Sequence, residues 1–231
     1  MQLFYDATAA DGHELTMDRT ESKHIARVLR KEVRDKLHLT DGKGNLYQAT
    51  ITDANPNKVK LACGLQRSTP NATPSLTLAI APTKSMDRLE WFLEKATEIG
   101  VQRFTPLITE RSERRSVKMD RLHRIAVGAM KQSNQLWLPI IDEPKSFHEV
   151  LKLEHASRLI AHCEEFAPSN ATEVIQQKDT IILIGPEGDF SPSEVNAARK
   201  SGYEELHLGT TRLRTETAGL VAVTAFSLYS R

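Results

Sequence analysis

The chain has 231 residues, of which 39% are hydrophobic and 26% are charged, and its formal net charge is only +1. This composition is that of an ordinary globular protein, and no apolar run is long enough to cross a bilayer. The N-terminus lacks the basic and then apolar pattern of a secretory signal. The two cysteines, Cys63 and Cys163, lie far apart and without metal-ligand spacing. We therefore expect a cytoplasmic protein that has free thiols and binds neither a membrane nor a metal ion.

The N-terminal part of the chain is predicted to form a small β-barrel with one helix, at residues 19–30. Alternating apolar and polar residues, separated by turn-forming sequences, indicate its strands. These strands are expected at residues 36–40, 46–52 and 58–65. Residues 68–74 are polar and contain two prolines, which is typical of a linker. We therefore predict one domain over residues 1–72 and a second over residues 73–231.

The second domain is predicted to be an α/β fold with a mostly parallel sheet, because strand and helix patterns alternate along it. The strands are expected at residues 75–81, 103–108, 158–162, 180–184 and 205–208. The helices are expected from Ser85 to Gly100, at residues 118–135, from Ser191 to Gly202 and at residues 215–230. Ser85 and Ser191 are the predicted N-caps, the second within a capping box that ends at Glu194, and the two glycines are the predicted stops. The first of these helices has a predicted apolar stripe, formed by Leu89, Phe92, Leu93 and Ala96. The last helix is apolar around much of its circumference, so it should be buried on more than one side.

Two glycine loops follow predicted strands of this sheet. Residues 185–188, Gly-Pro-Glu-Gly, come directly after a buried strand and before a helix. Ligands of open α/β sheets bind beyond the carboxyl ends of the strands, and glycine lets the backbone approach them closely. Neither the dinucleotide fingerprint nor the phosphate-loop motif is present. Taken alone, this segment is compatible with a tight turn as well as with a ligand loop.

The second glycine loop lies in residues 208–218 and carries two arginines, Arg212 and Arg214. In an extended loop these alternate residues share one side. Guanidinium groups beside the positive end of a helix are unfavourable unless an anion is near. This loop therefore favours a functional role over a structural one.

Basic residues are concentrated in two places although the net charge is small. Residues 111–131 contain seven lysines and arginines, and residues 24–36 contain a second cluster. Such clusters are either solvated helix faces or surfaces for an acidic partner.

Residues 184–190 followed by residues 208–218 resemble the bacterial 16S ribosomal RNA uridine N3-methyltransferase family, which belongs to the SPOUT class of knotted methyltransferases. Further segments that resemble the family are residues 84–90, 95–101, 110–112 and 131–133, together with residues 24–30 and 41–42 of its PUA-like RNA-binding barrel. Two positions depart from it. Arg34 stands where the family often has glycine, and Gln135 stands where it often has arginine, at a predicted RNA or partner contact.

The resemblance implies a C-terminal parallel sheet with a deep trefoil knot, an exception among folds, and an N-terminal PUA-like barrel. It also implies S-adenosylmethionine as the cofactor, held bent by the three loops that follow the strands ending near residues 162, 184 and 208. The residues expected to bind it are His162, Ile184, Gly185, Pro186, Glu187, Gly188, Leu208, Gly209, Leu213, Arg214 and Ala218.

The implied reaction moves a methyl group to N3 of a uridine in 16S ribosomal RNA. That nitrogen is a poor nucleophile while protonated, so the enzyme must remove its proton or stabilise the anion. The residues expected to do so are Arg214, Glu216 and Arg212. Glu187 and Asp189 are alternative bases, and His207 is a weaker one. Glu216 has a structural alternative, because a glutamate in the first helical turn stabilises the helix dipole.

The implied partners are 16S ribosomal RNA, in the assembled or assembling small subunit, and a second copy of the chain against the last helix. The residues expected to bind RNA phosphates are His24, Arg27, Arg30, Arg111, Arg114 and Arg115. Two other functions stay open. One is a SPOUT methyltransferase acting on another RNA, at a tRNA base or a ribose 2′-hydroxyl. The other is a non-catalytic, ribosome-associated RNA-binding protein, which would have no need of the glycine loops.

Overall fold

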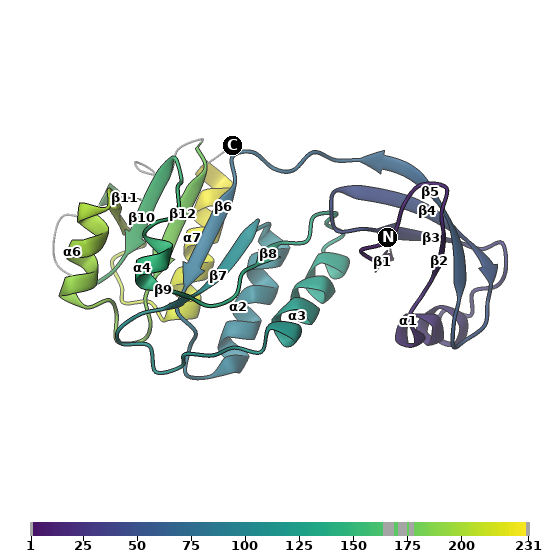
Figure 1. Cartoon of the computed structure of the whole chain (residues 1–231), viewed down its shortest axis with the longest axis horizontal. Coiled ribbons are helices and arrows are strands. Elements are labelled where there is room, and N and C mark those ends of the chain that lie inside the picture. Colours follow the sequence, from purple (N-terminus) through teal and green to yellow (C-terminus); the bar gives the residue numbers. More distant parts are fainter. Residues whose placement is uncertain (1, 164–168, 171–174, 176–177, 230–231) are drawn as a thin grey trace. The chain divides into compact units, whose positions relative to one another are not determined.

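The computed structural model describes residues 2–163, 169–170, 175 and 178–229. The chain divides into two compact units (Figure 1). The first unit comprises Met1–Asn71 and Met130–Leu138, and the second comprises Ala72–Ala129 and Pro139–Arg231. None of the described helices is both long and apolar enough to cross a membrane.

The first unit is built on a five-stranded curled sheet with the strand order β1-β3-β4-β5-β2. Its strands are β1 (Leu3–Tyr5), β2 (Glu14–Thr16), β3 (Lys36–Thr40), β4 (Asn45–Asp53) and β5 (Lys60–Ser68). All neighbours are antiparallel except β1 and β3. Side chains that alternate along the strands, such as Leu37, Leu39, Ala49 and Ile51, form its buried core. The three strands predicted here are confirmed, each within three residues at either end.

The predicted helix over residues 19–30 is wrong in its second half. An α-helix, α1, covers only Arg19–Lys23, and a π-helical turn, η1, covers His24–Val28. The amide of Leu29 donates to the carbonyl of His24, five residues back, and Arg30 has a left-handed φ of 52°. A π-turn is wider than an α-turn. His24, Arg27 and Arg30, whose spacing of three residues predicts a single stripe along an α-helix, therefore do not line up in this way.

Met130–Leu138 belongs to the first unit because its residues bond to the β4–β5 end of the sheet. The Trp137 indole donates to the Thr69 carbonyl at 3.0 Å, and the Gly44 amide donates to the Leu136 carbonyl at 2.9 Å. Gly44 has φ 90°, and a Cβ there would lie 2.6 Å from the Trp137 ring. Only glycine fits between them. The first unit is therefore discontinuous in sequence.

The second unit contains an eight-stranded sheet with the order β11-β13-β10-β12-β6-β7-β8, and β9 pairs with β7. All of these pairs are parallel, which confirms the predicted fold class. The strands are β6 (Leu76–Ile80), β7 (Arg103–Ile108), β8 (Ile140–Ile141), β9 (Lys145–Ser146), β10 (Ser157–Ala161), β11 (Ser169–Asn170), β12 (Thr180–Ile184) and β13 (Glu204–His207). Strands β8, β9 and β11 were not predicted, because each has only two residues, which is too short to show an alternating pattern. The trefoil knot stays a prediction.

The helices of the second unit are α2 (Met86–Ile99), α4 (Phe147–Val150), α6 (Pro192–Lys200) and α7 (Thr215–Tyr229). Helix α3 (Met119–Gln132) belongs to the second unit up to Ala129 and to the first unit from Met130 on. The predicted capping box at Ser191 is confirmed. Ser85 is the N-cap of α2, as predicted, but its side chain makes no capping hydrogen bond. Its carbonyl accepts from the Thr83 hydroxyl at 2.6 Å. The predicted apolar stripe of α2 is confirmed, with Leu89, Phe92, Leu93 and Ala96 fully buried.

Helix α7 packs against α2 and β6 with one face. Its buried positions are Thr215, Glu216, Gly219, Ala222, Val223, Ala225 and Phe226. A Cβ on Gly219 would lie 2.7 Å from Ile80 and 2.8 Å from Phe92, so the backbones approach closely at this point. At the C-terminal end, Leu228 and Tyr229 are 61% and 45% exposed. Within a single chain, the apolar surface of this helix is therefore only partly covered.

The backbone at Arg34 explains why the family that this sequence resembles often has glycine at the same position. Its φ is 79°, and its amide is fixed by a 2.9 Å bond to the Ile51 carbonyl. Left-handed backbone strains any side chain, so we expect Arg34→Gly to raise the free energy of unfolding by about 0.5–1 kcal/mol. Arg34→Ala removes the same charge but keeps the strain, and should bring no gain. Urea denaturation of both variants measures the difference. An equal rise in both would assign the effect to charge instead.

Candidate active site

The candidate site lies at the carboxyl ends of neighbouring parallel strands. β13, β10, β12 and β6 are adjacent in that order, and the two predicted glycine loops leave β12 and β13. Ligands of open parallel sheets bind at this edge.

The two glycine loops are joined by hydrogen bonds. The Thr215 hydroxyl, which is buried, donates to the Gly185 carbonyl at 3.1 Å. One Arg212 guanidinium nitrogen donates to the Glu187 carbonyl at 3.4 Å. The segments are about 25 to 30 residues apart in sequence, and the structure brings them together as expected.

Two residues of the 111–115 cluster also hold this region. Arg111 donates to the carbonyls of Gly188, at 2.8 Å, and of Phe190, at 3.2 Å. Arg114 donates to the Lys84 carbonyl at 2.9 Å, and the Lys84 amide in turn donates to the Glu187 carboxylate at 2.9 Å. These two predicted RNA-binding arginines are therefore engaged with the backbone around the loop.

The remaining predicted RNA-binding residues have different surroundings. Arg115, which is exposed, donates to the Glu110 carbonyl at 3.2 Å. In the first unit, the His24 ring bonds to the Gln2 amide at 2.8 Å. Arg27 and Arg30 are exposed.

Each glycine is required for its own physical reason. A Cβ on Gly185 would lie 3.1–3.2 Å from Phe190, inside ordinary contact distance. Gly209 has φ 134°, and the space where its Cβ would stand is open to at least 4 Å. Left-handed backbone at this angle is nearly restricted to glycine. Gly209 therefore leaves exposed backbone that a ligand can approach.

The loop after β10 is connected to the same place through Asp189. One carboxylate oxygen of Asp189 accepts from the Cys163 amide and the other accepts from the Phe190 amide, both at 2.8 Å. Both carboxylate oxygens of this candidate base thus already accept a hydrogen bond from a backbone amide.

The side chain of His162 points into the protein. It is 2% exposed, and its Nε2 lies 2.9 Å from the Glu205 carboxylate. Hydrogen bonds from Arg199 and His162 hold the pKa of Glu205 below its usual range. The backbone of His162 can therefore make the predicted contact with the cofactor, whereas its ring cannot.

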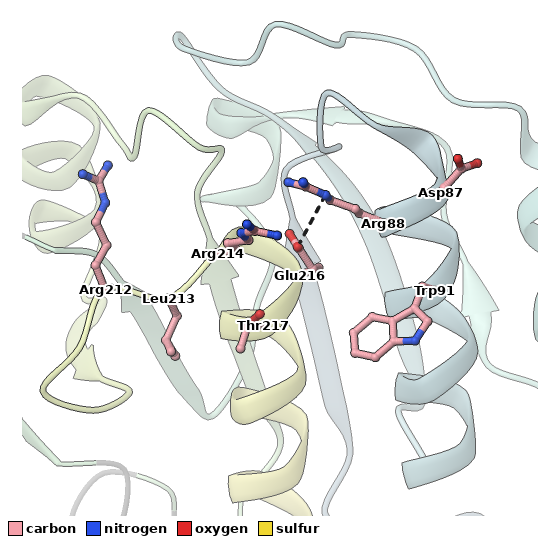
Figure 2. Close-up of a pocket in the computed structure, with 8 residues that line it drawn as sticks. All are labelled: Asp87, Arg88, Trp91, Arg212, Leu213, Arg214, Glu216 and Thr217. Carbon is pink, nitrogen blue, oxygen red and sulfur yellow. Dashed lines mark ion pairs between the residues drawn. The ribbon is translucent and has the colours of Figure 1, made fainter.

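A pocket of about 610 Å³ opens between α2, the second glycine loop and α7 (Figure 2). It is lined by Asp87, Arg88, Trp91, Arg212, Leu213, Arg214, Glu216 and Thr217. This volume is in the range of small-molecule sites. The Arg88 Nε atom lies 3.8 Å from a Glu216 oxygen, and the Glu216 side chain is only 9% exposed. Within the described residues, the Arg214 side chain makes no hydrogen bond or ion pair, so its guanidinium is available to a ligand.

The predicted cofactor residues that line this pocket are Leu213 and Arg214, whereas the others lie outside its lining. Ile184 and Pro186 are buried, and Leu208 and Ala218 are partly buried against the core. Glu187 and Leu213 are partly buried, whereas Gly188 is exposed. His207, the weaker base candidate, is also partly buried. No group of three metal-ligating side chains is assembled anywhere in the described ranges.

Sequence reasoning missed the wall that α2 contributes. Asp87, Arg88 and Trp91 lie off the apolar stripe of this helix, where a polar residue normally indicates a solvated face. The available signal was Trp91, a large aromatic side chain that lies outside the apolar stripe.

Thr215 allows a test of the bond between the loops. Thr215→Val keeps the side-chain volume but leaves the buried Gly185 carbonyl without this donor. We expect the free energy of unfolding to fall by about 1–3 kcal/mol. Thr224→Val is the matched control, because Thr224 is exposed on the same helix and donates only to Leu220; it should change stability by under about 0.5 kcal/mol. If urea denaturation finds both variants equally stable, the loop bond does not contribute.

Comparison with known proteins agrees with this architecture. A family model described as an RNA methyltransferase domain matches residues 70–227, and one described as an RNA methyltransferase PUA domain matches residues 18–62. A protein of Rickettsia conorii named ribosomal RNA small subunit methyltransferase E is 29% identical, over 96% of this chain and 93% of its own length.

Solved structures agree as well. A probable rRNA-methyltransferase from Porphyromonas gingivalis is 41% identical with a TM-score of 0.90, covering 96% of this chain and 95% of that one. A ribosomal RNA small subunit methyltransferase E from Neisseria gonorrhoeae, solved bound to S-adenosyl methionine, is 26% identical with a TM-score of 0.86, covering 99% and 97%. Because the domain model spans more than half of the chain, this protein belongs to the RNA methyltransferase family.

Proposed function

We propose that this protein methylates N3 of a uridine in the 16S ribosomal RNA of the small subunit, with S-adenosylmethionine as the methyl donor. The observation that carries the proposal is the junction of the two glycine loops beside a pocket that holds an uncommitted arginine, Arg214. The names of the Rickettsia and Neisseria proteins and the cofactor bound in the Neisseria structure support it.

The loops fit the proposed cofactor. Gly209 exposes backbone groups, which recognise an adenine edge, while Leu208 and Leu213 offer apolar surface. Gly185, Pro186, Glu187 and Gly188 would hold the cofactor from the other loop. When bound, S-adenosylmethionine supplies an electrophilic methyl group on a sulfonium.

The protein's own task is to make the uracil nitrogen nucleophilic. As N3 loses its proton, negative charge spreads onto the neighbouring carbonyl oxygens. The Arg214 guanidinium, which lines the pocket, would stabilise that charge. Arg212 also lines the pocket but already donates to the Glu187 carbonyl, so its main role would be to shape the loop.

Glu216 is the proposed proton acceptor. It lines the pocket two residues after Arg214, and Arg88 is its partner. Of the other candidates, Asp189 has both oxygens engaged by backbone amides, and Glu187 has one engaged by Lys84. The position of Glu216 in the first turn of α7 also stabilises the helix dipole, and the two roles are compatible.

We further propose that the protein acts as a homodimer in the cytoplasm, where ribosomal subunits are assembled. The exposed apolar end of α7 at Leu228 and Tyr229 supports the dimer. The PUA domain match supports RNA binding by the first unit, where exposed Arg27 and Arg30 would contact phosphates. The predicted domains over residues 1–72 and 73–231 would divide these tasks, with Met130–Leu138 added to the RNA-binding part.

A nucleoside digest tests the proposed function. Purified protein is incubated with unmethylated small subunits and methyl-labelled S-adenosylmethionine, and the RNA is hydrolysed and separated. We expect the label in 3-methyluridine. Label in a ribose-methylated nucleoside or in tRNA alone would favour the other methyltransferase, and calorimetry without cofactor binding would favour a non-catalytic RNA-binding protein.

Arg214→Ala separates catalysis from cofactor binding. We expect kcat to fall by about 100- to 1000-fold, because a donor aimed at developing charge is removed. The dissociation constant for S-adenosylmethionine, measured by calorimetry, should change only a few-fold. Arg212→Ala is the comparison and should weaken cofactor binding more. If Arg214→Ala instead reduces cofactor affinity as much as it reduces turnover, Arg214 forms part of the cofactor pocket.

A further inference from the structure

Trp91 is an aromatic side chain left open to solvent inside the candidate pocket. It is 46% exposed, although its neighbours Phe92 and Leu93 on α2 are fully buried. Its indole extends from α2 toward α7 and lines the pocket together with Arg88 and Arg214 (Figure 2). A large apolar ring that lines a concave site together with charged groups is available for contact with a ligand.

The charges around the ring indicate the kind of ligand. Three arginines and two acids line the pocket, and one of the acids, Glu216, is paired with Arg88. An aromatic face beside guanidinium groups is the arrangement that proteins use for unpaired nucleotides, whose bases stack while their phosphates meet the cations. A protein helix on the same surface would have to bury the Arg214 guanidinium, which is costly without an acidic partner.

We propose that the indole of Trp91 stacks on a base of the RNA substrate and holds that nucleotide beside Arg214. The proposal rests on the function proposed above and adds a substrate-binding residue to the same pocket. Stacking accepts any base, because every base has a π-face. Trp91 would therefore contribute RNA affinity and placement of the nucleotide, whereas the choice of uridine depends on polar groups.

Replacing the ring by an aliphatic side chain tests stacking itself. With small ribosomal subunits as substrate, Trp91→Leu should raise the KM for RNA by about 10- to 100-fold, the range found for loss of one base–aromatic stack. Trp91→Phe keeps an aromatic face and should stay within a few-fold of the parent protein. Calorimetry should give the same affinity for S-adenosylmethionine in all three proteins. A Trp91→Leu variant with unchanged kinetics overturns the proposal.

Tryptophan fluorescence provides a readout that does not require methylation. The chain has two tryptophans, and the other, Trp137, lies in the first unit. In a Trp137→Phe variant the emission therefore comes from Trp91 alone. Binding of 16S ribosomal RNA, followed in parallel by filter binding, should quench it. RNA bound without quenching overturns the proposal.

Two further outcomes are separable. If Trp91→Leu sediments as a smaller species than the parent protein, the indole belongs to an interface with a second copy and the proposal is wrong. If the parent protein binds RNA but yields no 3-methyluridine, the proposed function fails while the fluorescence result still decides the role of Trp91. Absence of RNA binding by the parent protein overturns both.

Discussion

The site depends on the carbonyl groups of one loop, residues 185–190. Backbone polar groups near the core must find partners, and this loop takes them from elsewhere in the chain. Gly185 accepts from Thr215 and Glu187 accepts from Arg212. The carbonyls of Gly188 and Phe190 accept from Arg111. The hydrogen bonds to these carbonyls therefore bring together the segments that follow β7, β12 and β13. The pocket takes its shape from these bonds.

This arrangement divides the arginines of the site by task. Arg111 and Arg212 donate to loop carbonyls, and Arg88 pairs with Glu216. Arg214 has no partner among the described residues and faces the pocket. The net charge of +1 conveys none of this, since it adds structural and functional guanidinium groups together. For a site that must stabilise an anion, an arginine without a partner is more informative than the net charge.

Sequence reasoning succeeded where one local rule decides the structure. The buried strand before Gly185, the capping box at Ser191 and the paired glycine loops follow from periodicity, side-chain bonding and the shared edge of parallel strands. It failed where distant contacts decide. The π-turn at His24–Val28 departs from a helical pattern, and the inclusion of Met130–Leu138 in the first unit depends on the fit of Trp137 against Gly44. Arg88 and Trp91 were missed because their exposure on α2 resembles an ordinary solvated face.

The width of the pocket depends on Gly219, which lies outside the pocket lining at the contact between α7 and α2. A glycine inside a helix costs about 1 kcal/mol relative to alanine, yet here a Cβ would meet Ile80 and Phe92 at under 3 Å. The absence of that atom lets α7 lie close against α2. Phe92 is the neighbour of Trp91, and Gly219 lies one turn beyond Glu216, so the same close contact fixes the walls that carry the indole and the carboxylate. A larger residue at Gly219 would separate these walls without touching any ligand. The pocket thus depends on a helix interior that sequence propensity alone would count as a weakness.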